Sequence, residues 1–153
     1  KQQIMVSQET ATDVMSVLIV LICLKFHVTI MSAMSTNQRP PEDLKGKPDA
    51  PIEDMDSNEA ASNGFTPADR WARIIKNDFE NIPVTLALMI YSTLNVNTSP
   101  LLNIITGSVF LCARVSHTIC YANGLQPWRS LSFGVGFLAE LTLMGNIVYS
   151  SFA

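Results

Sequence analysis

A cluster of charged and amide side chains lies between residues 70 and 82, directly before an apolar stretch that begins at Pro83. Four of these side chains share one face of an α-helix, which turns about 100° per residue: Arg70, Arg73, Asn77 and Glu80. A guanidinium group binds a carboxylate with paired hydrogen bonds, and a carboxylate accepts hydrogen bonds from an ammonium group. This face therefore predicts a binding site for a small zwitterionic molecule. The alternative is a self-neutralising network of charges within one helix.

A second polar face lies further along the chain, where Arg114, His117 and Tyr121 recur at helical spacings of three and four residues. Arg129 follows at the head of the next apolar block. If both faces belong to neighbouring membrane helices, they meet at a similar depth and enclose a cation-rich, partly desolvated cavity. An unpaired charge in a membrane costs several kcal/mol, so two aligned polar faces favour a bound ligand over coincidence.

The elements that must position these residues are four apolar blocks separated by polar segments. Hydrophobic residues make up 48% of the 153 residues and charged residues only 15%. This composition predicts a single domain over residues 1–153, an all-α, up-and-down four-helix bundle that spans a membrane. The predicted spans cover residues of about 13–35, 66–95, 100–122 and 127–150. The second helix would be about 45 Å long against about 30 Å of hydrocarbon, so its first turns stand outside the bilayer.

Turn signals mark the ends of these helices. Thr66-Pro67 and Ser99-Pro100 each combine an N-cap residue with a proline in the first turn, and Asn123-Gly124 closes the third helix. Residues 36–65 are rich in Pro, Asp, Glu and Ser, which predicts a long polar loop. Lys and Arg concentrate in this loop, its flanks and the third loop, so the positive-inside rule makes both loops cytosolic.

Several other functions are disfavoured by composition. The net charge of -3 offers no basic stripe for nucleic acid. The three cysteines lie in apolar blocks without metal-ligand spacing, which favours small buried side chains over metal ligands. Two ionisable residues stand inside predicted spans: Lys25 is expected to snorkel, and Glu140 to pair with Lys25 or with another chain.

Three motifs in this order resemble one known group of proteins. They are Arg-x-x-Arg-x-x-x-Asn-Asp-x-Glu-Asn-Ile at 70–82, Arg-x-x-His-Thr-x-x-Tyr at 114–121 and Gln-Pro-x-Arg at 126–129. The chain resembles the superfamily of membrane-associated proteins in eicosanoid and glutathione metabolism. The resemblance implies a homotrimer in the endoplasmic reticulum membrane, with the mitochondrial outer membrane as a second location. It also implies glutathione held between subunits near the cytosolic face, without a metal.

The resemblance assigns roles to matching positions. The residues expected to contact glutathione are Arg73, Asn77, Glu80, His117, Tyr121 and Arg129, with Arg70 and Arg114 in support. Arg129 and Ser130 match residues thought to hold the thiolate. A free thiol has a pKa of about 8.5, and a nearby guanidinium favours the nucleophilic thiolate. Arg129 is therefore the candidate thiolate stabiliser, with Tyr121 or Ser130 donating a hydrogen bond.

The chain departs from the family pattern at two places. Ile74-Ile75 stands where the family often has Ala-His, so one histidine contact is absent and Lys76 is expected to substitute in part. The element Pro41-Glu42-Asp43 follows Arg39 much more closely than usual. Either the loop is shortened there or Arg39 is not the family's ligand-binding arginine, and Arg39 is kept as a binding candidate.

The pattern favours a glutathione transferase and peroxidase that acts on lipophilic electrophiles or lipid hydroperoxides entering from the bilayer. Glu-Asn-Ile and Gln-Pro-x-Arg lean toward the microsomal glutathione transferases, and Phe133 replaces a polar aromatic residue of the prostaglandin E synthases. The alternatives are a glutathione-dependent prostaglandin E synthase and a non-catalytic lipid-binding membrane partner.

Overall fold

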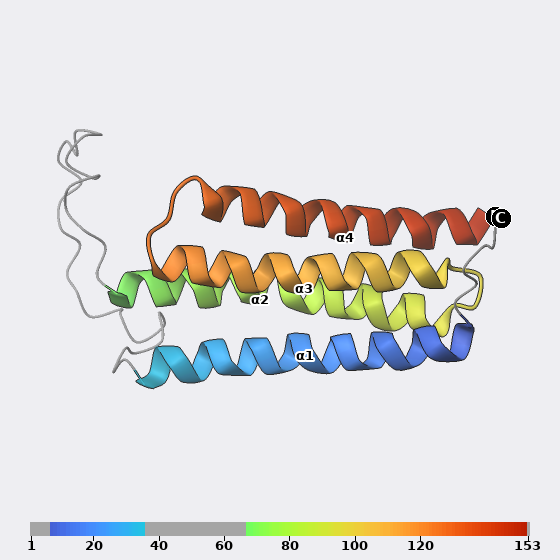
Figure 1. Ribbon diagram of the computed structural model, residues 1–153, viewed down its shortest axis with the longest axis horizontal. Helices are drawn as coiled ribbons and strands as arrows, with labels where there is room; N and C mark the ends of the chain where they lie inside the picture. Colours follow the sequence, from blue (N-terminus) through green and yellow to red (C-terminus); the bar gives the residue numbers. More distant parts are fainter. Residues whose placement is uncertain (1–6, 36–66, 153) are drawn as a thin grey trace.

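The computed structural model describes residues 7–35 and 67–152, and these residues form four helices that lie side by side along the long axis of the molecule (Figure 1). The helices are α1 (Gln8–Ser35), α2 (Pro67–Leu94), α3 (Pro100–Ala122) and α4 (Trp128–Phe152). Helices that follow one another in the chain run in opposite directions (Figure 1). The predicted all-α, up-and-down bundle is confirmed. Arg39 and the rest of the predicted loop at 36–65 lie outside the described residues.

The ends of the helices follow the turn signals. Ser99 is the N-cap of α3 with Pro100 in the first turn, although the Ser99 side chain makes no capping hydrogen bond. Asn123 is the C-cap of α3, and Gly124 after it has a positive φ of 69°. Helix α1 begins at Gln8, five residues before the predicted start of the span at about residue 13. The extra residues extend the helix beyond its most apolar part.

Within the described residues, three helices are long and apolar enough to cross a membrane: α1, α3 and α4. Helix α2 has 28 residues, the same number as α1, but its first half carries the charged cluster. Large apolar side chains point away from the bundle, including Leu24, which is 54% exposed, and Val28, which is 52% exposed. Such an apolar exterior is what a bilayer requires of a membrane bundle, because lipid replaces water as the solvent.

The interior has an apolar middle and a polar network near the α2–α3 turn. Met15, Met89, Phe110 and Leu143 are among the buried residues that join the four helices. The polar network fastens the α2–α3 turn to α4 through buried amides. Within it, Asn103 donates to Thr98 Oγ1 at 2.9 Å and Asn146 donates to Asn103 Oδ1 at 2.8 Å.

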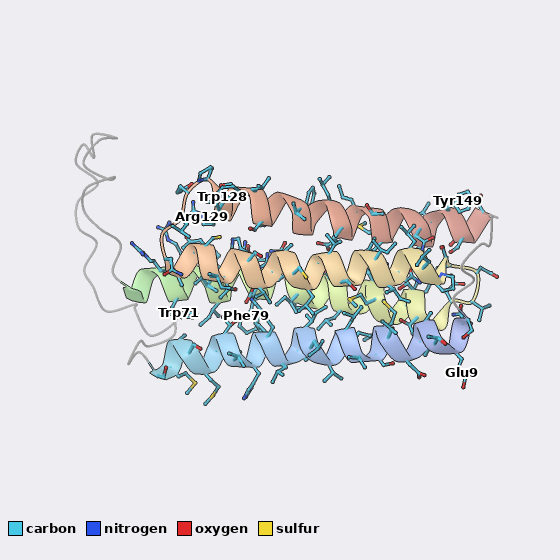
Figure 2. The ribbon with its side chains drawn as sticks, viewed as in Figure 1. Glu9, Trp71, Phe79, Trp128, Arg129 and Tyr149 are labelled. Atoms are coloured by element: carbon cyan, nitrogen blue, oxygen red, sulfur yellow. The ribbon has the colours of Figure 1, made fainter. Side chains whose placement is uncertain are left out.

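The predicted site residues lie toward the opposite end of the bundle. Trp71, Trp128 and Arg129 lie near the end where α2 and α4 begin, whereas Glu9 and Tyr149 lie near the other end (Figure 2). Two tryptophans at one end suit the level of the lipid headgroups, where indole rings concentrate.

Candidate functional site

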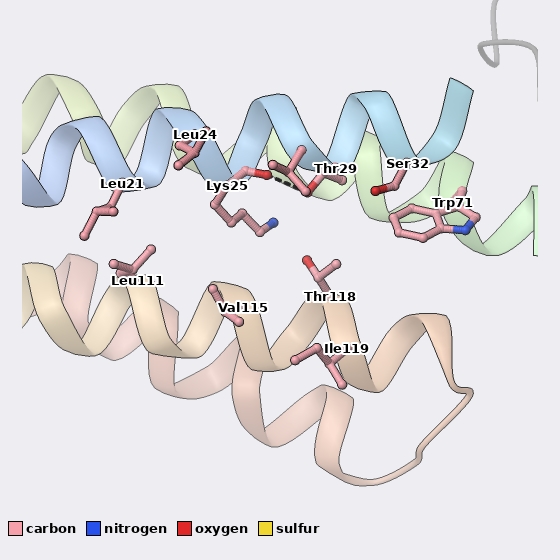
Figure 3. A pocket seen from close by; sticks show the side chains of 11 residues that line it. Leu21, Leu24, Lys25, Thr29, Ser32, Trp71, Leu111, Val115, Thr118 and Ile119 are labelled. Carbon is pink, nitrogen blue, oxygen red and sulfur yellow. Dashed lines mark hydrogen bonds between the residues drawn. The ribbon is translucent and has the colours of Figure 1, made fainter. Parts of the chain in front are cut away.

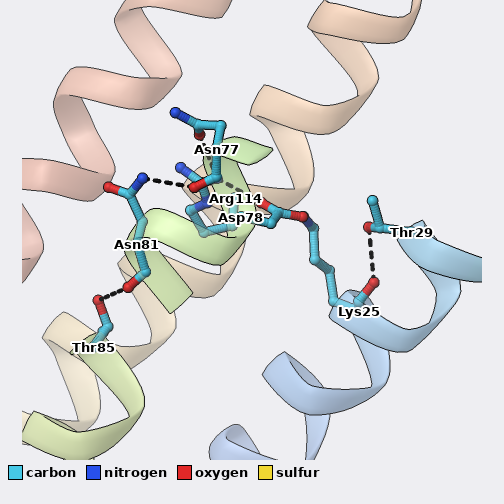
Figure 4. Close-up of polar contacts among 7 residues, drawn as sticks. All are labelled: Lys25, Thr29, Asn77, Asp78, Asn81, Thr85 and Arg114. Carbon is cyan, nitrogen blue, oxygen red and sulfur yellow. Dashed lines mark hydrogen bonds and ion pairs between the residues drawn. The ribbon is translucent and has the colours of Figure 1, made fainter. Parts of the chain in front are cut away.

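Asp78 is the centre of a buried ionic cluster that joins three helices. Its side chain on α2 is 0% exposed, and Oδ1 accepts a hydrogen bond of 2.5 Å from Arg114 Nη2 on α3. The other oxygen, Oδ2, accepts from Lys25 Nζ on α1 (Figure 4). A carboxylate shared by two cations is the arrangement that lets charges stay in a medium of low dielectric.

This cluster corrects the expectation that Lys25 snorkels or pairs with Glu140. Lys25 pairs with Asp78 and not with Glu140, because α1 packs against α2 and α3 whereas Glu140 lies on α4. The acid that reaches the interior is Asp78, whereas Glu80 is exposed on the outer face of α2. Asp78 lies off the polar face formed by Arg70, Arg73, Asn77 and Glu80, so the spacing of that face does not indicate it. The spacing of apolar residues does indicate its position. Asp78 is four residues from both Ile74 and Ile82, which lie on the apolar face of α2 that the bundle buries.

Arg114 links this cluster to the predicted binding face. It is 2% exposed, and its Nη2 also donates to Asn77 Oδ1 at 2.6 Å. The two polar faces of the sequence therefore meet, with Asn77 and Arg114 in direct contact. Asn77 lies about three turns into α2. The backbone carbonyl of Asn77 accepts a further hydrogen bond of 2.7 Å from Asn81 Nδ2 (Figure 4).

Two buried nitrogens beside this contact have no hydrogen-bond partner among the described residues. They are Arg114 Nε and His117 Nδ1, on neighbouring turns of α3. Leaving a buried polar group without a partner costs on the order of 1–3 kcal/mol, more when the group is charged. Each such atom in a native structure calls for an explanation, and a bound polar ligand or water molecule is one.

A row of rings and one guanidinium leads from His117 to the start of α4. The ring centroids of His117 and Tyr121 are 5.6 Å apart, and the Arg129 Cζ lies 4.6 Å from the Tyr121 centroid. Phe133, one turn beyond Arg129, approaches His117 with a centroid distance of 6.2 Å. The cation over the ring face holds Arg129 beside Tyr121 through a cation–π contact. Ser130, the other residue predicted at this point, is exposed.

Arg70 contacts the C-terminal end of α3. Its Nη1 donates to the Ala122 carbonyl oxygen at 3.2 Å, a favourable place for a cation because helix C-termini carry partial negative charge. Arg70 therefore contacts the backbone at the α3–α4 turn, and its supporting role in binding stays a prediction. Arg73, Lys76 and Glu80 form an exposed face of α2 on the isolated chain.

Replacing Gly124 with alanine is expected to destabilise the bundle by more than about 1 kcal/mol, because a side chain at φ 69° is strained. The added Cβ would also lie 3.1 Å from Arg70 Nη1 and disturb the contact with Ala122. Gly145→Ala is the matched control, because a Cβ there meets no heavy atom within 4 Å. The stability of both variants is measured by the loss of helical circular dichroism on titration with sodium dodecyl sulfate. Identical transitions for Gly124→Ala and wild type would contradict the prediction.

These features define a multi-pass membrane protein, a helical bundle with a cation-rich polar cluster toward one end. The chain belongs to the MAPEG family, whose family model matches residues 14–149. A comparison with curated proteins finds no significant match. Family membership implies a membrane function related to glutathione or eicosanoids, and the family consists mostly of glutathione-dependent enzymes. Its members generally bind glutathione.

Proposed function

We propose that the chain is a membrane-bound glutathione transferase and peroxidase, of the microsomal glutathione transferase 1 type. The observation that carries the proposal is the contact between Asn77 and Arg114, beside the unpartnered nitrogens Arg114 Nε and His117 Nδ1. Arg129, held against Tyr121 at the start of α4, lies along the same row of residues. A polar, cation-rich cluster of this kind fits a small anionic peptide better than an apolar substrate.

The charges of glutathione match this cluster. Glutathione carries two carboxylates and one ammonium group at neutral pH. In the proposal Arg114 Nε and His117 bind it from α3, and Arg73, Lys76 and Arg39 supply cations for its carboxylates. Glu80 accepts from the ammonium group, and Asn77 offers its amide. Arg70 keeps the turn beside the site in place.

The exposed position of Arg73, Lys76 and Glu80 supports a site shared between subunits. On the isolated chain these residues line the outer face of α2, although charges at this depth normally face a polar cavity. In the proposed homotrimer this face turns toward a neighbouring subunit, and glutathione lies between the two. The active site then faces the cytosol from the endoplasmic reticulum membrane, or from the mitochondrial outer membrane.

The chemistry is assigned to Arg129, with Tyr121 and Ser130. The Arg129 guanidinium stabilises the thiolate of glutathione, and a hydroxyl of Tyr121 or Ser130 donates a hydrogen bond to the sulfur. The thiolate attacks an electrophilic carbon, forms a thioether, and the leaving group departs with its electron pair. With a lipid hydroperoxide the thiolate attacks oxygen, which releases an alcohol and leaves a sulfenic acid. A second glutathione thiol converts the sulfenic acid to a disulfide and water.

The proposal is tested by assaying purified protein with glutathione and three substrates in parallel: chlorodinitrobenzene, a lipid hydroperoxide and prostaglandin H. We expect turnover of the first two. Turnover of prostaglandin H alone would assign the chain as a prostaglandin E synthase and overturn the transferase assignment. Turnover of none of the three, with glutathione bound, would favour a non-catalytic lipid-binding partner.

A further inference from the structure

A cavity of about 430 Å³ lies between α1 and α3, with Trp71 of α2 at one end (Figure 3). Its volume falls within the range of about 300–1,000 Å³ that is usual for small-molecule sites. Apart from Trp71, the lining residues come from α1 and α3, two helices that are apolar enough to cross a membrane. Leu21, Leu24 and Val28 among them are exposed on the outside of the bundle, so the cavity is open to lipid. A molecule dissolved in the bilayer can therefore enter it sideways.

The lining of this cavity is mostly apolar but has a gradient: its polar side chains, Lys25, Thr29, Ser32 and Thr118, lie in the half toward Trp71, among Val28, Val115 and Ile119. Leu21, Leu24 and Leu111 line the end that lies deeper in the bundle, and Lys25 and Thr118 follow. Ser32 and Trp71 line the end near the start of α2. Leu21 and Ser32 are separated by about 16 Å along α1, at about 1.5 Å per residue. This gradient matches the orientation of a lipid in a bilayer, with its polar group near the membrane surface and its tail toward the bilayer centre.

Thr118 provides an unused hydroxyl in this cavity. Threonines inside helices commonly donate to the carbonyl four residues earlier, and six described threonines do so here: Thr12, Thr29, Thr85, Thr93, Thr106 and Thr142. Thr118 Oγ1 is buried and has no hydrogen-bond partner among the described residues. Figure 3 shows this oxygen directed toward Lys25 across the space between the helices.

Lys25 has hydrogen-bonding capacity left at this point. The ionic cluster contains two cations, Lys25 and Arg114, and one carboxylate, Asp78. Lys25 also lines the cavity, and its ammonium group has three N–H donors, one of which is directed to Asp78. An anionic group in the cavity would accept from both Lys25 and Thr118.

We propose that this cavity is a second ligand site, which binds a single-chain lipid with a carboxylate, that is, a long-chain fatty acid. The carboxylate lies at Lys25 and Thr118, and the chain extends along Leu24 and Leu111. A cavity of about 430 Å³ holds one acyl chain, which disfavours a phospholipid with two chains. The site is separate from the proposed glutathione site: His117 packs toward Phe133 of α4, whereas the next residue, Thr118, faces α1.

Binding is tested with purified full-length protein and three photoreactive probes of equal chain length: a fatty acid, the corresponding fatty alcohol and a phosphatidylcholine. We expect the fatty acid to label peptides of residues 21–32 and 111–119 most strongly, with competition by unlabelled oleate. The alcohol lacks the charge, so its labelling should be weaker. Equal labelling by all three probes, or labelling by phosphatidylcholine alone, would overturn the proposal.

Two variants locate the site. Thr118→Val removes only an unpartnered hydroxyl, so we expect unchanged stability and about tenfold weaker binding of the fatty acid. Thr142→Val, at an exposed and internally bonded threonine of α4, is the matched control and should bind like wild type. Val115→Trp fills the cavity and should abolish labelling. Undiminished labelling of both Thr118→Val and Val115→Trp would refute the site, whatever the enzymatic activity of the chain.

Discussion

Asp78→Asn is expected to lower the free energy of unfolding by roughly 3–5 kcal/mol, the cost of removing one partner from a buried ionic cluster. The substitution keeps the shape of the side chain but leaves Lys25 and Arg114 without their shared carboxylate. Both cations lie in a medium of low dielectric, where repulsion between them is strong. The measurement is the loss of helical circular dichroism on titration of the purified protein with sodium dodecyl sulfate.

The matched control is Glu80→Gln, the same chemical change two residues further along α2. Glu80 is exposed on the isolated chain, so its loss should alter stability by no more than about 0.5 kcal/mol. Under the proposed function it should instead raise the KM for glutathione. The double variant Lys25→Met with Asp78→Asn removes one of the two cations and should recover part of the lost stability. If the Asp78→Asn protein unfolded at the same detergent concentration as the wild type, the ionic cluster would contribute little to stability.

Arg129→Ala is expected to reduce kcat for chlorodinitrobenzene by about 100-fold or more, the usual effect of removing one group that stabilises developing or resident negative charge. The guanidinium lies over the Tyr121 ring at 4.6 Å, at the edge of the bundle, so the fold should persist without it. The ultraviolet absorbance of the bound thiolate provides a second measurement, independent of the electrophile. We expect this absorbance to disappear in Arg129→Ala.

Two conservative variants separate the roles at this position. Arg129→Lys keeps the charge but loses the planar fork, so it should retain part of the thiolate signal. Tyr121→Phe keeps the ring beneath Arg129 and removes only the hydroxyl. A normal thiolate signal in Tyr121→Phe would assign the hydrogen bond to Ser130. If Arg129→Ala retained full thiolate absorbance, Arg129 would not be the stabiliser.

Much of the fold follows from local sequence. The apolar blocks and the pairs Ser99-Pro100 and Asn123-Gly124 predicted the helices to within a few residues, because membrane thickness and turn chemistry act locally. Only Gln8–Ser35 begins clearly earlier than predicted, since polar residues can extend a helix beyond its apolar part. The contact between Asn77 and Arg114 was also predictable in outline. Two antiparallel helices joined by a short turn place residues at the same depth in the membrane next to each other.

By itself, the sequence determined the class of protein, the order of its helices and the polar faces of α2 and α3, since each depends on composition and helical period. The tertiary structure alone decided that Asp78, and not Glu80, joins three helices, and that Lys25 is its partner. The pairing of ions across helices depends on which sides of the helices pack together, and that choice is made by all contacts of the bundle at once. The same packing left Thr118 Oγ1 unpartnered beside a lipid-facing cavity.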